Sequence, residues 1–216
     1  MNIAKEHIII AVIAGIIAVA LTVTAIVLKL KHRMPDRATN TKKITTLSVM
    51  SALSIVLMIL IRIPFPPAPF LEYDPADIPI LISTFLFGPW WGLIMTAAVS
   101  VIQGITVSSS SGIIGIIMHF AATGGFVIVA GLIYTRGKNI KRAIIALVAG
   151  TLVQTALMVL MNLIFTPIFM STPVETVIGM LIPVIIPFNL IKAGVNAILT
   201  FVVYKFVSRS VSALFD

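Results

Sequence analysis

Long apolar segments without charge dominate this sequence. Ile8 to Leu28 contains no charged residue, and comparable segments recur between about residue 44 and residue 206. A helix needs about 20 apolar residues to span the hydrocarbon core of a bilayer, and these segments lack the alternation of a barrel strand. Only 10% of the residues are charged, whereas about a quarter are charged in soluble proteins. The sequence therefore predicts an all-α integral membrane protein.

Breaks between the apolar segments predict seven crossings. The interval from residue 78 to residue 105 is too long for one crossing, and Gly88-Pro89 is a turn signal, so we expect two helices there. The expected crossings after the first are 44–61, two helices within 78–105, 112–134, 143–165 and 184–206. Residues 166–183 contain three prolines and are expected to form an outer loop with a short helix.

Basic residues cluster in three places, which predicts the topology. Six lie in a linker at residues 29–43, four at 136–142, and two near the C-terminus, at Lys205 and Arg209. Because Lys and Arg concentrate in cytoplasmic loops, we expect a multi-pass protein of the cell membrane with its N-terminus outside and C-terminus inside. The predicted parts are a signal-anchor helix (1–28), a basic cytoplasmic linker (29–43) and a six-helix core (44–208).

Composition also excludes several classes of function. The formal charge of +8 is confined to short loops between apolar segments, which indicates membrane topology and not a nucleic-acid surface. The absence of cysteine excludes disulfides, thiolate metal sites and cysteine catalysis. No spacing among the three histidines suits a metal ion. We therefore expect no metal, no cofactor and no catalytic residues.

Lys192 is the most costly residue in the predicted membrane segments. A charge near the bilayer centre costs about 2.5–3.5 kcal/mol on insertion scales. Asn189 and Asn196 lie three residues before it and four residues after it, so all three share one helix face. One interpretation is a lysine that snorkels to the interface. The second interpretation is that Lys192 belongs to a polar lining on the last crossing, and the two asparagines on its face favour this one.

Two acids and one histidine have ordinary structural explanations. Asp77 is expected to cap the short helix that follows it, with Pro79 in the first turn. Asp74 can likewise be explained as a turn residue whose side chain hydrogen-bonds the nearby backbone. His119 is expected to be a packed, hydrogen-bonded residue outside the site.

Three stretches of the chain carry a family resemblance: FLEYDPADIPILI (70–82), FGPWWG (87–92) and PFNLIKAGVNAILTFVVYK (187–205). They resemble the substrate-binding S components of energy-coupling factor (ECF) vitamin transporters, most closely the riboflavin-specific members. The small residues Ser48 and Ala52 match an alanine-x-x-x-alanine pattern of the family, with serine at the first position. The resemblance to this family covers residues 42–208. The extra N-terminal helix departs from the family.

The resemblance implies a six-helix transmembrane bundle that captures a vitamin from outside. It implies partners too: a transmembrane T component and two ATPases, since this chain has no phosphate-binding loop. The resemblance implies substrate-binding roles for polar residues and for residues of the outer loop that covers the pocket: Asn189, Lys192, Asn162, Tyr73, Leu71 and Asp74. Asp74 is expected to balance the charge of Lys192. Ser48 and Ala52 would contact the T component through close helix packing.

Other functions remain open from the sequence alone. The nearest alternative is an S component for another vitamin of the pantothenate, folate or pyridoxine type, because a fold does not determine its ligand. A membrane-embedded enzyme would need a cluster of acid, base or metal groups, which the sequence does not suggest. An ion-coupled carrier is disfavoured because no acid is expected within the core helices.

Overall fold

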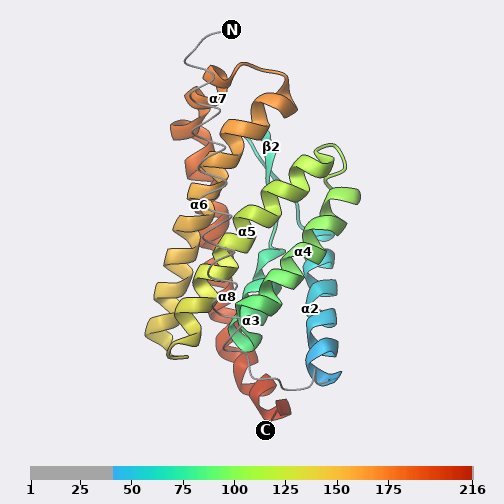
Figure 1. Cartoon of the computed structure of the whole chain (residues 1–216), viewed down its shortest axis with the longest axis vertical. Coiled ribbons are helices and arrows are strands. Elements are labelled where there is room, and N and C mark those ends of the chain that lie inside the picture. The colour runs from blue at the N-terminus through green and yellow to red at the C-terminus, as the bar shows by residue number, and fades with distance from the viewer. Residues whose placement is uncertain (1–40, 216) are drawn as a thin grey trace. The chain divides into compact units, whose positions relative to one another are not determined.

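In the computed structural model the described residues run from 41 to 215, and nearly all of them are helical. The predicted anchor (1–28) and the linker up to residue 40 lie outside the described residues. From Thr45 onward the chain forms one compact unit (Figure 1). Its helical elements are α2 (Thr41–Leu60), α3 (Asp77–Phe87), α4 (Pro89–Ile105), α5 (Gly112–Thr135), α6 (Ile140–Met170), α7 (Val174–Met180), the π-helical turn η1 (Leu181–Ile185) and α8 (Ile186–Phe215).

Four helical segments of the described chain are long and apolar enough to cross a membrane. They are Lys43–Leu60, Gly112–Thr135, Ile140–Met170 and Val174–Tyr204. α3 and α4 are apolar but shorter, with 11 and 17 residues. The predicted all-α membrane architecture is confirmed, and α2 to α6 with α8 are the six helices of the predicted core.

The expected turn at Gly88-Pro89 separates α3 from α4. Gly88 has a φ of 96°, a conformation that side chains rarely adopt, and its N–H donates to the carbonyl of Thr84. Pro89 then occupies the first turn of α4, where no amide donor is needed. Every residue of α3 from Asp77 to Phe85 is buried. This short helix is therefore the most enclosed element of the bundle.

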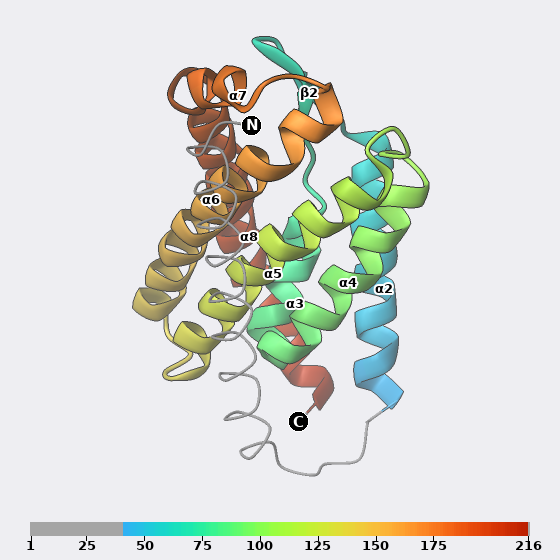
Figure 2. The ribbon, with the colours of Figure 1, turned by 45° about the horizontal axis from the view of Figure 1, so that its top comes forward.

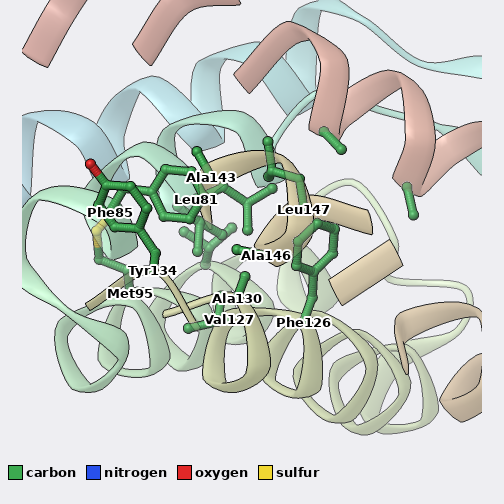
Figure 3. Close-up of a cluster of buried hydrophobic side chains, with 14 of the residues drawn as sticks. Leu81, Phe85, Met95, Phe126, Val127, Ala130, Tyr134, Ala143, Ala146 and Leu147 are labelled. Carbon is green, nitrogen blue, oxygen red and sulfur yellow. The ribbon is translucent and has the colours of Figure 1, made fainter. Parts of the chain in front are cut away.

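The main hydrophobic core lies where α3, α4, α5 and α6 meet (Figure 3). Phe85 of α3 stacks on Tyr134 of α5 with ring centroids 4.3 Å apart. Phe126 of α5 packs so closely on α6 that a Cβ on Gly150 would lie 2.1 Å from the ring. Glycine at this position lets α5 and α6 approach, which brings the polar residues of both helices together.

A β-hairpin that the sequence did not predict connects α2 to α3. Its antiparallel strands are β1 (Ile63–Phe65) and β2 (Ala68–Tyr73), and Ile63 pairs with Tyr73. Phe65 contacts Phe188 of α8 with ring centroids 5.3 Å apart, and Leu71 is buried in the same apolar cluster. The hairpin and α7 lie at the same end of the bundle (Figures 1 and 2).

The last crossing begins earlier than residue 184. α7, η1 and α8 run on without a break from Val174, so most of the expected outer loop is helical. Pro187 has no N–H to donate to Pro183, and the chain takes a π-helical turn just before it, in which Ile186 N–H bonds the carbonyl of Leu181. π-helical turns are frequent at functional sites, and this one ends four residues before Asn189.

Candidate functional site

A cavity of about 360 Å³ lies between the hairpin and helices α4, α5, α6 and α8. Its size is within the range of small-molecule sites. Five of the six residues predicted to bind substrate line it, namely Leu71, Asp74, Asn162, Asn189 and Lys192. These residues span 121 positions of the sequence, from Leu71 to Lys192, and come from β2, the β2–α3 connection, α6 and α8. The fold therefore brings most of the predicted site together.

Tyr73 is the predicted residue that the cavity lining does not include. Its hydroxyl donates to Oδ1 of Asn196 at 3.1 Å, so its polar atom is directed toward α8. Burial and the neighbouring Asp74 carboxylate raise the pKa of the Tyr73 phenol above its ordinary value, so it stays a neutral donor. Tyr73 thus anchors the hairpin to α8.

Lys192 and Asp74 form an ion pair at the cavity. Lys192 Nζ lies 2.7 Å from Asp74 Oδ2 and 3.3 Å from the backbone carbonyl of Glu72. The expected charge balance is therefore present, and the snorkelling interpretation does not apply. A lysine ammonium has three N–H donors. With two directed at these acceptors, one remains for a ligand in the cavity.

Two asparagines present amide groups to the same cavity. Asn189 Nδ2 donates to the carbonyl of Ile185 at 2.8 Å, and Asn162 Nδ2 donates to that of Met158 at 2.7 Å. Each bond joins the side chain to its own helix one turn earlier and so restricts its rotation. Each amide nitrogen keeps a second N–H, so both side chains can act as oriented donors.

The cap role expected for Asp77 is wrong. Asp77 is the first residue of α3, but its side chain is only 1% exposed and makes no local cap. Its carboxylate accepts from Thr123 Oγ1 at 3.1 Å and from Asn196 Nδ2 at 3.4 Å. An acid therefore does lie among the core helices, contrary to expectation. Its partners come from α5 and α8, far away in sequence, which is why the local pattern misled.

His119, expected to lie outside the site, lines the cavity. Its Nδ1 is 2.7 Å from Ser100 Oγ, and its Nε2 is 3.3 Å from Asp77 Oδ1. Nε2 makes no hydrogen bond at this distance and only lies beside the Asp77 carboxylate. Gln154 of α6 also lines the cavity and contacts Asp77, and the sequence reasoning gave it no role. The sequence did contain a signal for Gln154, because a polar side chain inside an apolar membrane segment often marks a functional site.

The remaining charges at the cavity are also paired. Arg62 follows α2, and its guanidinium bonds both the Glu72 carboxylate and the backbone carbonyl of Val107. These contacts join the hairpin to the loop between α4 and α5. The cations and carboxylates that line the cavity therefore neutralise one another, which suits an uncharged ligand.

Comparison with known families identifies the protein class. A family model described as "ECF transporter, substrate-specific component" matches residues 42–204. The protein belongs to this family. It is a transporter component and not an enzyme, which agrees with the resemblance seen in the sequence. The fold expected from that resemblance is confirmed as well.

Curated and solved relatives agree with this S component along most of its length. The riboflavin transporter RibU of Staphylococcus aureus (strain TCH60) is 30% identical over 171 residues, covering 76% of this chain and 89% of the relative. The riboflavin transporter FmnP of Bacillus subtilis (strain 168) is 28% identical over 163 residues, covering 70% and 84%. A solved structure titled "Structure and mechanism of the S component of a bacterial ECF transporter" superposes with a TM-score of 0.68 at 29% identity, covering 79% of this chain and 97% of that one.

Ser48 and Ala52 lie on the outer face of α2 in this S component. Both are exposed, as are the neighbouring apolar residues Val49, Leu53 and Val56. α2 buries a smaller share of its residues than the other three membrane-length segments, and it lies at one edge of the bundle (Figure 2). The small residues therefore do not serve packing within the bundle.

Proposed function

We propose that this S component binds riboflavin and delivers it across the cell membrane. Riboflavin combines a flat apolar ring system with a polar edge of carbonyl and N–H groups. The cavity offers the matching chemistry: apolar walls such as Phe188 and Leu71, and oriented donors on Lys192, Asn189 and Asn162. The observation that carries the proposal is the paired Lys192, which presents a hydrogen-bond donor without adding net charge.

This charge balance also separates riboflavin from some of the alternative vitamins. Folate and pantothenate carry carboxylates, which bind more strongly beside an unpaired cation than beside neutral donors. Lys192 is paired with Asp74, and Arg62 with Glu72. The neutral flavin ring is the better electrostatic match, and the names of the curated relatives support the same ligand.

Purified protein in detergent should bind riboflavin and quench its fluorescence, while folate and pantothenate in excess should not compete. Asn189→Ala should weaken binding roughly tenfold, because one oriented hydrogen bond to the ring edge is lost. The matched control is Leu190→Ala, which removes an exposed apolar side chain from the next position of α8. Equal affinity of wild type and Asn189→Ala would reject the ring-edge assignment, and absence of riboflavin binding would reject the ligand.

We propose that the N-terminus lies outside and the C-terminus inside, as the distribution of basic residues indicates. A membrane-impermeant maleimide can test this, because the chain has no cysteine of its own. Thr176→Cys, on the exposed surface of α7, should react in whole cells. Thr135→Cys, at the opposite end of the bundle and next to basic residues, should react only after lysis. The reverse labelling pattern would overturn the topology.

S components of this family work with energising partner subunits, and we propose a specific set of partners for this chain. One transmembrane T component and two ATPases would form the complete importer with this chain. The exposed small residues Ser48 and Ala52 would form the contact with the T component, because small side chains allow two helices to approach closely.

A further inference from the structure

The cavity extends along α6 well beyond the ring-edge donors. Asn162 and Gln154 both line it and lie eight residues apart on this helix, roughly 12 Å along its axis. Thr123 and His119 line the same part of the cavity from α5. The end of the cavity near Gln154 is therefore polar and distinct from the end near Asn162.

Contacts with Asp77 determine how Gln154 is oriented. Its Nε2 lies 3.4 Å from Asp77 Oδ2 and 3.5 Å from Thr123 Oγ1. A carboxylate only accepts hydrogen bonds, so the amide nitrogen must be the atom that faces Asp77. The amide oxygen, Oε1, is consequently directed away from the carboxylate.

Gln154 Oε1 is a buried acceptor without a donor. The residue is 5% exposed, and within residues 41–215 no group donates to this oxygen. A buried polar atom that lacks a partner destabilises the protein, and a ligand donor would recover that free energy. Among the other polar lining residues, Arg62 bonds Glu72 and Val107, and Ser111 Oγ donates to the carbonyl of Ser108. Gln103 Oε1 also lacks a donor, but Gln103 is only half-buried, whereas Gln154 is buried.

We propose that Gln154 accepts a hydrogen bond from a hydroxyl of the ligand, and that this end of the cavity is a subsite for a neutral polyhydroxyl chain. Thr123 and Asp77 are positioning residues that orient the Gln154 amide. The proposal rests on the proposed function, because riboflavin carries such a chain on its ring. Asn189 and Lys192 would take the ring edge while Gln154 takes the chain.

The test compares riboflavin with lumiflavin, which has the same ring but a methyl group in place of the hydroxylated chain. Gln154→Met removes the amide and keeps the length of the side chain. We expect it to weaken riboflavin binding roughly tenfold and to leave lumiflavin binding within twofold of wild type. Leu152→Ala, two residues earlier on α6 and 58% exposed away from the cavity lining, is the matched control and should leave both affinities unchanged.

Two outcomes would overturn the subsite. Equal losses for both flavins would show that Gln154 only supports the fold, and unchanged riboflavin affinity would place the chain elsewhere. Lumiflavin binding by the variant itself reports that the protein is folded, and Gln154→Leu serves as the second variant if Gln154→Met does not purify. Failure of the proposed function is distinguishable, because then the wild-type protein itself would bind neither flavin.

Discussion

Lys192→Met is expected to weaken riboflavin binding by at least about a hundredfold. Methionine preserves the length of the side chain but removes all three N–H donors. The ring edge would lose one donor, and Asp74 would lose its cation at 2.7 Å. Removing one member of a buried ion pair costs roughly 3–5 kcal/mol, because the remaining charge is left uncompensated. Part of this cost appears as a loss of affinity for riboflavin. A bound flavin excludes water from the cavity, and that water would otherwise solvate Asp74.

A companion variant separates the two roles of the lysine. In Lys192→Met/Asp74→Asn the uncompensated carboxylate is gone, and the amide oxygen that replaces it can still accept from the N–H of Ala76, as Asp74 Oδ1 does at 3.1 Å. We expect the double variant to regain thermal stability relative to Lys192→Met but not riboflavin affinity. Fluorescence titration and thermal unfolding in detergent measure both quantities.

Two results would contradict this account. If Lys192→Met bound riboflavin within threefold of wild type, the lysine would have no contact with the ligand. If the double variant recovered full affinity, Lys192 would act only by neutralising Asp74.

The sequence was sufficient to find Lys192 because a charge in an apolar segment is costly wherever the segment folds. The spacing of Lys192 to Asn189 and Asn196 predicts one shared face of α8. In the structure Lys192 on this face contacts the hairpin and Asn196 contacts α3. These inferences need only the helical repeat and the cost of burial, and neither depends on tertiary structure.

Asp77, His119 and Gln154 could not be assigned from local pattern. An aspartate at the start of a helix is usually a cap, so the local expectation for Asp77 was reasonable. Tertiary packing overrides that local expectation: α5 and α6 approach closely at Gly150, and α3 is enclosed by α4, α5 and α8. That packing gives Asp77 four side-chain partners, from residues 119, 123, 154 and 196.

The hairpin was missed for a related reason. A stretch with four prolines reads as an irregular loop, and Pro64 lies within a strand, where proline is tolerated only at an edge. This sheet has only two strands, so both of its strands are edges. The hairpin is held by its contacts with α8, through Phe65 and Tyr73, and not by its own strand propensity.

Ser48→Trp is expected to abolish riboflavin uptake in cells while leaving riboflavin binding by the purified protein unchanged. Ser48 is exposed on α2, beside Val49 at 61% exposure, so the bundle itself has room for the indole. A partner helix packed against a small-residue face would have to move several ångströms away. Uptake of labelled riboflavin and co-purification of the T component should both fall to background.

Val148→Trp is the matched control for this variant. Val148 is 57% exposed and lies about two turns from the start of α6, and Ser48 lies at a similar distance from the start of α2. Both helices follow basic loops, so the two positions should have similar depth in the membrane, and only one lies on the small-residue face. Val148→Trp should therefore keep uptake near wild type.

Two outcomes would contradict the proposed interface. Loss of ligand binding in Ser48→Trp would show that the α2 face supports the fold, and loss of uptake in both variants would show that any bulky group at this depth is harmful. Either outcome would remove Ser48 and Ala52 from the partner interface, whereas selective loss in Ser48→Trp is the result expected if α2 packs against the T component.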